Sequence, residues 1–473
     1  MAVENYFSEL LVRKMGMEPT SGQRELFEKL GRFLTVAPSE FPLLVVRGYA
    51  GTGKTTAVSA FIKVLKELKH KFVLLAPTGR AAKVLSNYSG MQAKTIHKQI
   101  YRQRSLSDKE SKFAIDFNKS RDTVYIVDEA SLITIGSGFE TSIFGTGDLL
   151  DDLISYIRQN SGNKLILMGD SAQLPPIGLE ESPALDFDYV SQYSHLAEEV
   201  TLTEVVRQAG ESGILYNATL LREEIERGDL DAPRFRCRGF DDFRRISGGE
   251  LIEELDGAIS KYGLDEVVVL CRSNMRANRY NMGIRQTVLF MEEQLTRGDK
   301  LMIVKNCYQF LENVPDLDFI ANGDVAELVK IGNYEERYGL HFAQATLKFP
   351  DYNDVEIDAK IILDTLSSVS PSLDREQQQA LFEGVYADYE DITVRKKRME
   401  KVREDKYYNA LQIKYAAAIT GHKSQGGQWN CVFVDNNLWK DEISLDDKKW
   451  LYTAMTRAVE KVYLVNFNDK YFE

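Results

Sequence analysis

Residues 43–68, "LLVVRGYAGTGKTTAVSAFIKVLKEL", carry the pattern that decides the fold. The apolar run at 43–46 predicts a buried strand, and the glycine-rich pattern G-x-x-x-x-G-K-T follows it at once. Beyond this loop, apolar residues recur at helical spacing: Val58, Phe61, Ile62, Leu65 and Leu68. Strand, loop and helix in this order predict a phosphate-binding loop, because the N-terminus of the helix attracts anions.

The residue types of the loop suit contact with a nucleotide. Its glycines let backbone N–H groups approach phosphate oxygens, Lys54 reaches the outer phosphates, and the Thr55 hydroxyl can ligate Mg²⁺. The expected contacts are Gly48, Tyr49, Ala50, Gly51, Thr52, Gly53, Lys54, Thr55 and Thr56. The alternative is a chance glycine-rich turn, and the loop alone leaves kinases, GTPases, transporters and motors open.

A second apolar run, "TVYIVDEAS" at 123–131, ends in two carboxylates that can divide the work of hydrolysis. Asp128 is predicted to hold Mg²⁺ through its water shell, and Glu129 to orient and deprotonate the water that attacks the γ-phosphate. A water-activating base indicates hydrolysis and not transfer. The alternative is a solvated strand end, which is common for a lone Asp-Glu pair.

The segment "LILMGDSAQLPPIG" at 165–178 predicts a third strand of the same parallel sheet, with its carboxyl end at the same crevice. Gln173 would then lie at the γ-phosphate, where its amide can hydrogen-bond a phosphate oxygen and the attacking water. Pro175 and Pro176 cannot continue a strand and fix the turn, although they also fit an ordinary rigid loop.

The composition sets limits on the class of protein. A chain of 473 residues, 44% of them hydrophobic, can bury more than one core. No apolar run approaches the ~18 residues that span a bilayer, and the start, "MAVENYFSEL", lacks a secretion signal, so we expect a soluble cytoplasmic protein without a membrane partner. A net charge of −12 argues against a uniformly basic surface but allows a narrow basic channel. Four widely spaced cysteines are expected to be reduced: Cys237, Cys271, Cys307 and Cys431.

Together with further motifs in the expected order, these segments resemble the superfamily 1 helicases over nearly the whole chain. The stretch "TSGQ" at 20–23 resembles the adenine-reading motif, with Gln23 as the reader. The stretches "LAPTGRAAKVL" at 75–85 and "KTIHKQIY" at 94–101 are similar to motifs Ia and Ib, which touch single-stranded nucleic acid. The segment "ITGHKSQGGQWNCVFVD" at 419–435 resembles motif V, which implies Gly427 at the nucleotide.

The resemblance also implies two arginine fingers. Arg207 lies in "LTEVVRQ", which resembles motif IV, and Arg457 lies in "WLYTAMTRAVEKVYLV", which resembles motif VI. Two fingers outside the first sheet imply a second lobe, with ATP bound between the lobes. Four apolar runs, "EVVVLC", "KLMIVKN", "CVFVD" and "KVYLV", predict the second sheet. Without the other motifs, Arg457 would be taken for a surface arginine of a helix.

The "QLPP" form of the third motif resembles the RecD/Dda branch, superfamily 1B, and not the UvrD type. This implies an α/β fold of two RecA-like P-loop NTPase lobes, with a short hairpin insert in the first and a small SH3-like β insert in the second. The expected limits are 1–97 and 121–200 for the first lobe, 98–120 for its pin-like insert, 201–330 and 411–473 for the second lobe, and 331–410 for the SH3-like insert.

The two inserts are predicted in unequal detail. The segments "GLHFAQATLKF" and "DVEIDAKIIL" in the second alternate as strands should. The first could be a hairpin turning near 107–110, with Phe113 as a candidate wedge between separating strands. An ordinary packing role for Phe113 is the open alternative.

Residues that grip a nucleic-acid backbone without reading bases are hydroxyls, imidazoles, amides and arginines. The resemblance assigns this role to Thr78, Arg80, Thr95 and His97 in the first lobe, and to Thr420, His422, Ser424 and Gln425 in the second. Asn274, near a strand end, is a further candidate, although its setting is not diagnostic. The basic run "VRKKRMEKVREDK" at 394–406 fits a solvated helix with i,i+4 ion pairs, and also a nucleic-acid site.

These observations predict an ATP- and Mg²⁺-dependent DNA helicase that moves along single-stranded DNA, 5′ to 3′ by resemblance. The expected partners are single-stranded DNA and tailed duplex DNA, with a monomeric protein and a role in DNA replication, repair or recombination. An RNA helicase of the same superfamily and an ATP-gated nucleic-acid clamp without unwinding are the alternatives.

Overall fold

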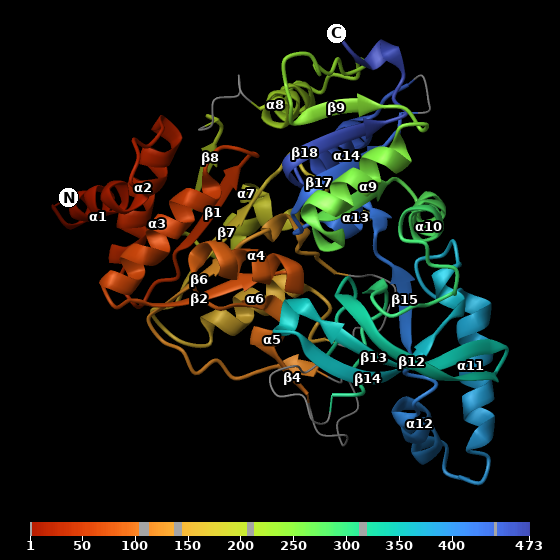
Figure 1. Ribbon diagram of the computed structural model, residues 1–473. Coiled ribbons are helices and arrows are strands. Elements are labelled where there is room, and N and C mark those ends of the chain that lie inside the picture. Colours follow the sequence, from red (N-terminus) through yellow and green to blue (C-terminus); the bar gives the residue numbers. More distant parts are fainter. Residues whose placement is uncertain (1, 104–112, 137–143, 206–211, 312–318, 439–441) are drawn as a thin grey trace.

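The computed structural model describes residues 2–103, 113–136, 144–205, 212–311, 319–438 and 442–473 (Figure 1). Its strands form two parallel sheets, a closed barrel and a two-stranded hairpin. In Figure 1 the first lobe, coloured red to yellow, lies beside a second lobe in green and blue, and the barrel lies below the second lobe. The α/β fold with two RecA-like lobes is therefore confirmed.

The first lobe is a parallel sheet in the order β3-β2-β6-β7-β1-β8. Its strands are β1 (Leu43–Gly48), β2 (Lys71–Ala76), β3 (Ala93–Thr95), β6 (Thr123–Val127), β7 (Lys164–Gly169) and β8 (Ala197–Leu202). Its helices are α1 (Ala2–Met15), α2 (Ser21–Thr35), α3 (Lys54–Glu67), α4 (Gly79–Ser89), α5 (Ile96–Ile100), α6 (Leu149–Arg158) and α7 (Phe187–Val190).

Strand β1 shows why the opening segment folds as it does. Leu44 and Val46 pack in the core on the face of α3, whereas Leu43 and Val45 pack in a second core on the other face. A parallel strand covered on both faces needs this continuous apolar run. Because β6, β7 and β1 are parallel neighbours, their carboxyl ends and the polar residues that follow them lie at one edge of the sheet.

The second lobe is a parallel sheet in the order β16-β10-β17-β18-β9. Its strands are β9 (Phe243–Ile246), β10 (Val267–Cys271), β16 (Ala418–Thr420), β17 (Trp429–Asp435) and β18 (Ala458–Val465). Its helices are α8 (Gly213–Glu226), α9 (Leu251–Tyr262), α10 (Asn274–Gly283), α13 (Gly421–Ser424) and α14 (Leu445–Met455). The cysteines are free thiols, as expected.

The barrel is closed by five strands: β11 (Lys300–Ile303), β12 (Val325–Arg337), β13 (Leu340–Phe349), β14 (Val355–Ile362) and β15 (Leu411–Tyr415). The prediction that "KLMIVKN" belongs to the second parallel sheet is wrong, because β11 pairs antiparallel with β12 and β15. An apolar run predicts a strand but does not say which sheet it joins. The barrel strands thus begin and end outside 331–410, while the domain limits and the SH3-like classification stay predictions.

Two helices, α11 (Arg375–Asp388) and α12 (Arg395–Glu404), lie between β14 and β15 and extend the barrel away from both lobes (Figure 1). Their side chains pack with residues of β13 and β14 in a small core. Its buried members are Leu340, Phe342, Ile362, Leu373, Leu381, Val385, Val402, Tyr407 and Ala410.

The first insert contains an antiparallel pair, β4 (Tyr101–Gln103) and β5 (Phe113–Ile115), which we call the hairpin insert. The turn predicted near 107–110 lies outside the described residues. Phe113 is only 2% exposed, and its ring lies 4.9 Å from those of Phe144 and Tyr308. This burial favours the packing role over the wedge role, because a wedge has to meet the duplex.

A buried ion pair joins the second lobe to the barrel. Arg285, just beyond α10, donates to both carboxylate oxygens of Asp299 at 2.7 and 2.9 Å, and each side chain is 3% exposed. The Arg285 guanidinium also lies 4.7 Å from the ring centre of Tyr415 in β15. A bidentate pair of this kind fixes the orientation of the barrel on the lobe.

Candidate ATP and nucleic-acid sites

The phosphate loop joins β1 to α3 in the predicted geometry. Gly51 and Gly53 both have φ of 77°, in the left-handed region that favours glycine. Lys54 begins α3, and its Nζ donates to the Gly48 carbonyl. The same Nζ lies 3.9 Å from Asp170 Oδ2. Thr55 follows, exposed in the first turn of α3.

Gln23 lies at this loop but holds it by a different contact from the predicted one. Its Nε2 donates to the Thr52 carbonyl at 3.0 Å, and its Oε1 accepts the Thr20 N–H at 3.1 Å in a capping box of α2. Both ends of the amide are therefore engaged within the protein. In this state Gln23 supports the phosphate loop, and adenine reading stays a prediction.

The two acids after β6 have different environments. Asp128 accepts the Glu129 N–H at 2.9 Å and the Tyr88 hydroxyl at 2.7 Å. Glu129 has φ of 53°, a left-handed conformation that is uncommon for non-glycine residues. Burial raises the pKa of the Glu129 carboxyl, Arg457 opposes this rise, and Asp128 adds to it. A carboxylate of raised basicity suits the predicted role of proton acceptor.

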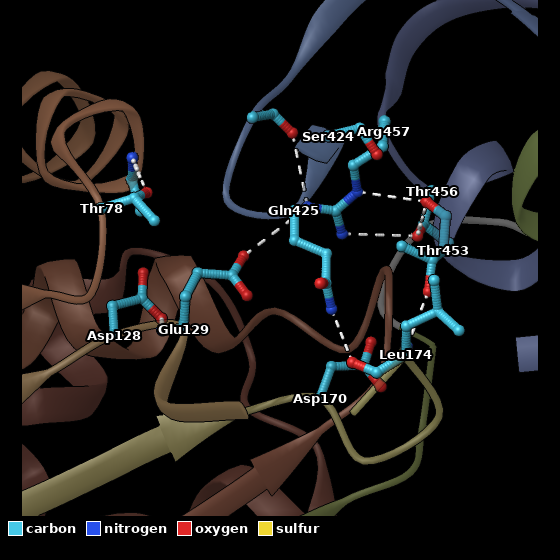
Figure 2. A network of polar contacts seen from close by, with 12 residues as sticks. Thr78, Asp128, Glu129, Asp170, Leu174, Ser424, Gln425, Thr453, Thr456 and Arg457 are labelled. Atoms are coloured by element: carbon cyan, nitrogen blue, oxygen red, sulfur yellow. Dashed lines mark hydrogen bonds and ion pairs between the residues drawn. The ribbon is translucent and has the colours of Figure 1, made fainter. Parts of the chain in front are cut away.

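The turn after β7 is held by the second lobe (Figure 2). The Leu174 N–H donates to Thr453 Oγ1 at 2.8 Å, and the Leu174 carbonyl accepts from Gln425 Nε2 at 2.5 Å. The neighbouring Gln173 is 6% exposed, and among the described residues its Oε1 has no hydrogen-bond partner. An acceptor buried without a partner is costly unless a ligand or water satisfies it.

Of the two predicted arginine fingers, Arg457 is placed at the site and Arg207 lies outside the described residues. Arg457 is 4% exposed, so it is not a surface arginine, and it lies between α14 and β18. Its Nη1 lies 3.8 Å from Glu129 Oε1 and donates to the Gly427 carbonyl at 3.4 Å (Figure 2). Arg457 thus reaches from the second lobe to the predicted base of the first.

A groove of about 290 Å³ runs between both lobes and the barrel. It is lined by six of the predicted nucleic-acid contacts: Thr78, Arg80, Thr95, His97, His422 and Gln425. The barrel side adds residues that the sequence did not indicate: Asn306, Phe319, Ala321, Asn322, Gly323, Asp324 and Tyr352. Three segments far apart in the chain therefore meet in one groove.

Neutral hydrogen-bonding groups are the largest class among the lining side chains, and Arg80, Lys98 and Lys423 add basic ones. Burial lowers the pKa of His97 to about 4, and burial together with Arg272 lowers the pKa of His422, so both imidazoles are uncharged at neutral pH. Thr78 and Thr95 also cap α4 and α5 by accepting the N–H of Ala81 and Lys98. Such a groove suits contact with backbone sugar and phosphate without base reading.

Three predicted contacts do not line this groove. The Ser424 hydroxyl is fully buried and donates to the Gly421 carbonyl at 2.7 Å, so its placement does not support the predicted contact. Thr420 precedes α13, and Asn274 begins α10, each half-buried. The resemblance indicated Thr420 and Ser424, and a place near a strand end indicated Asn274; neither signal gives the direction of a side chain.

Two tyrosines contact the candidate ATP site, and the sequence did not single them out. The Tyr452 hydroxyl of the second lobe accepts the Ala50 N–H at 2.8 Å and donates to Asp170 Oδ2 at 2.7 Å. Tyr88 lies near the end of α4, whose first residues line the groove, and bonds Asp128. Only the fold brings these two hydroxyls to the carboxylates of Asp128 and Asp170. Asp170 itself could have been found from the sequence, because it directly follows β7.

Two family models match the chain. An AAA domain matches residues 20–234, which include the phosphate loop and the whole first sheet, and a UvrD-like helicase C-terminal domain matches residues 415–465, which include β16, β17 and β18. Over the described residues, no helix has the length and apolar character needed to cross a membrane.

Relatives include uncharacterized protein R530 of Acanthamoeba polyphaga mimivirus, 25% identical over 88% of this chain and 93% of that protein. The chain is 30% identical to the ATP-dependent RecD2 DNA helicase of Deinococcus radiodurans, over 37% of this chain and 21% of the relative. It is 26% identical to the ATP-dependent DNA helicase dda of Enterobacteria phage T4, over 64% of this chain and 65% of the relative. A solved structure of Pif1 helicases at forked double-stranded DNA is similar over 97% of this chain and 94% of the Pif1 chain, with a TM-score of 0.47 and 15% sequence identity.

These matches define the class first: the chain has the two lobes, in order, of a superfamily 1 helicase. Within that class, the matches to the RecD2 and dda helicases fit superfamily 1B. The chain spans about a fifth of the length of RecD2 and about two thirds of that of dda.

Asp324 generates a pH prediction. This carboxyl, 4% exposed, accepts the Tyr352 hydroxyl at 3.0 Å where the barrel meets the first residues of α4, and burial raises its pKa to about 7. The folded state binds this proton more tightly than the unfolded chain, whose aspartates have a pKa of about 3.9. Its contribution to the free energy of unfolding therefore falls as pH rises from about 4 to about 7, then stays level.

We expect Asp324→Asn to remove this part of the pH dependence. Between pH 5 and pH 8 the wild type should lose on the order of 2 kcal/mol more stability than the variant, measured by urea unfolding at each pH. The exposed Asp354→Asn, just before β14 of the same barrel, serves as the control. Equal pH dependence in all three proteins would contradict the prediction.

Tyr88 generates a second prediction. Tyr88→Phe removes the hydrogen bond to Asp128, so the predicted metal ligand loses its orientation. We expect the Mg²⁺ concentration for half-maximal ATP hydrolysis to rise by about tenfold. Tyr125→Phe, which removes another buried hydroxyl of the same lobe, should leave the Mg²⁺ dependence unchanged. An unchanged Mg²⁺ dependence in Tyr88→Phe would exclude a role for this contact.

Proposed function

We propose that the chain is an ATP-dependent DNA helicase that moves along single-stranded DNA, 5′ to 3′, and unwinds duplex DNA. One observation carries the proposal: Gln425 lines the groove and also donates to the Leu174 carbonyl, directly after Gln173. A single side chain thus connects the candidate nucleic-acid groove with the candidate sensor of the γ-phosphate. A change in the γ-phosphate site when ATP binds or is hydrolysed can therefore alter how tightly the groove holds the nucleic acid.

The residues present fit Mg²⁺-ATP. The glycine loop presents N–H groups and the positive end of α3, and the unpartnered Gln173 Oε1 offers an acceptor for the attacking water. Lys54 and Thr55 would hold the phosphates and the metal together with Asp128. The bound Mg²⁺ supplies neutralisation of charge on the phosphate oxygens.

Hydrolysis then depends on side chains from both lobes. Glu129 accepts a proton from the attacking water at its carboxylate, and Gln173 orients that water. Arg457, and Arg207 by resemblance, stabilise charge on the γ-phosphate in the transition state. Because Arg457 lies 3.8 Å from Glu129 in this structure, it would exchange this partner for the phosphate when ATP binds.

Movement follows from the same contacts. The second lobe holds the Leu174 peptide, the Ala50 N–H and Glu129, so a change in the phosphate loop or the carboxylates shifts the lobes relative to each other. Each lobe contributes its own residues to the groove, so this shift displaces one grip relative to the other. The resemblance to the RecD/Dda branch is the basis for four further parts of the proposal: the preference for DNA, the direction of movement, the monomeric state, and a role in replication, repair or recombination.

The first test is ATP hydrolysis with and without single-stranded DNA. We expect DNA to stimulate hydrolysis, and Lys54→Ala or Glu129→Gln to lower the stimulated rate by about 10²-fold or more, because the loss of a phosphate contact or a general base costs that much. Lys63→Ala, exposed on α3, should behave as wild type. Activity that survives Lys54→Ala would overturn the assignment.

The second test separates the finer alternatives. We expect ATP-dependent strand separation on a duplex with a 5′ tail and little on one with a 3′ tail. The same tails in RNA should support less unwinding, whereas stronger unwinding of RNA would favour the RNA helicase. ATP-dependent binding without strand separation on either tail would favour a clamp.

A further inference from the structure

Helix α12 carries a basic surface that the proposed function does not use. Its exposed basic residues, with Lys406 just beyond the helix, are Arg395, Lys396, Lys397, Lys401, Arg403 and Lys406. The chain as a whole has a net charge of −12, so this concentration of positive charge is local.

The ion pairs that would make α12 an ordinary solvated helix do not form. The sequence allowed i,i+4 pairs, but the pair present is Lys401 with Glu404, an i,i+3 pair at 3.0 Å. Within the ranges that the structure describes, Arg395, Lys396, Lys397 and Arg403 form no salt bridge with a carboxylate. These charges are available to an external anion.

The helix is held firmly in place. Val402 is fully buried against α11, and Arg398 donates to the Tyr386 carbonyl at 2.8 and 2.6 Å with its guanidinium 3.7 Å from the Tyr386 ring centre. The unpaired basic side chains therefore project from a fixed support.

One segment, 307–309, links the end of α12 to the hairpin insert. Gln309 Nε2 donates to the Arg403 carbonyl at 3.3 Å, and the adjacent Tyr308 ring lies 4.9 Å from Phe113 of β5. Cys307 Sγ contacts the Asn409 carbonyl at 3.4 Å and ties the same segment to the region after α12. In Figure 1, α12 and β4 both lie on the lower side of the molecule, outside the parallel sheets.

The chemistry of this face fits duplex DNA better than a single strand. Sites for single strands combine positive charge with aromatic rings on which bases stack, and α12 contains no aromatic residue. Phosphates of a duplex need only charge, and Arg395 to Arg403 span roughly 12 Å, which corresponds to about three to four phosphates of one strand counted along the duplex axis.

We propose that the basic face of α12 binds the phosphate backbone of duplex DNA ahead of the hairpin insert. The inference rests on the proposed function, which brings a duplex to that insert. The face holds the duplex in line with the groove, so that the strands part at a fixed place. It adds affinity for tailed duplexes and none for the single-stranded tail.

The test compares nucleic-acid binding by the full chain without nucleotide. Fluorescence anisotropy is measured with a labelled 5′-tailed duplex and with the tail alone, for wild type and for Lys396→Glu/Lys397→Glu. Lys63→Glu/Lys66→Glu on α3 is the control, since it makes the same change in net charge elsewhere on the surface. Circular dichroism checks that each protein is folded.

We expect the α12 variant to bind the tailed duplex at least about fivefold more weakly, with the slope of log K against log salt reduced by about two. Its affinity for the tail alone should match that of wild type. Equal weakening on the tail, no change on either ligand, or the same loss in the control would each overturn the proposal. Failure of the helicase assignment is seen separately, as absence of strand separation by the wild-type protein.

Discussion

The peptide of Leu174 is the contact on which the relation between the lobes depends. It belongs to the turn after β7 in the first lobe, yet its N–H and its carbonyl are both satisfied by side chains of the second, Thr453 and Gln425. Leaving either group unpaired in this buried position costs about 1–3 kcal/mol. The turn beside the candidate γ-phosphate site therefore cannot move without the second lobe responding.

Around this turn, both lobes contribute side chains to the candidate ATP site. Tyr452 joins the Ala50 N–H to Asp170, and Arg457 faces Glu129. The backbone of Glu129 has a left-handed conformation, which the packed residues around it maintain. Side chains of both lobes therefore build the candidate site, and these contacts couple the two halves of the chain.

The barrel has its own connections to each lobe. Arg285 and Asp299 tie it to the second lobe through a buried bidentate pair, whereas Asp324 and Tyr352 meet the start of α4 in the first. It thereby completes the groove on the side that neither lobe covers. Its helices α11 and α12 extend away from both lobes, and α12 carries the basic face.

The sequence by itself determined the elements that local patterns specify: the strand, glycine loop and helix of 43–68, the carboxylates at 128–129, Gln173 after β7, and the strands at 340–349 and 355–362. These depend on periodicity and on residue types that a phosphate site requires. Tertiary structure alone decided that "KLMIVKN" joins the barrel, that Phe113 is buried, and that Tyr88 and Tyr452 reach Asp128 and Asp170. Such facts depend on contacts between residues tens to hundreds of positions apart, which a local pattern does not encode.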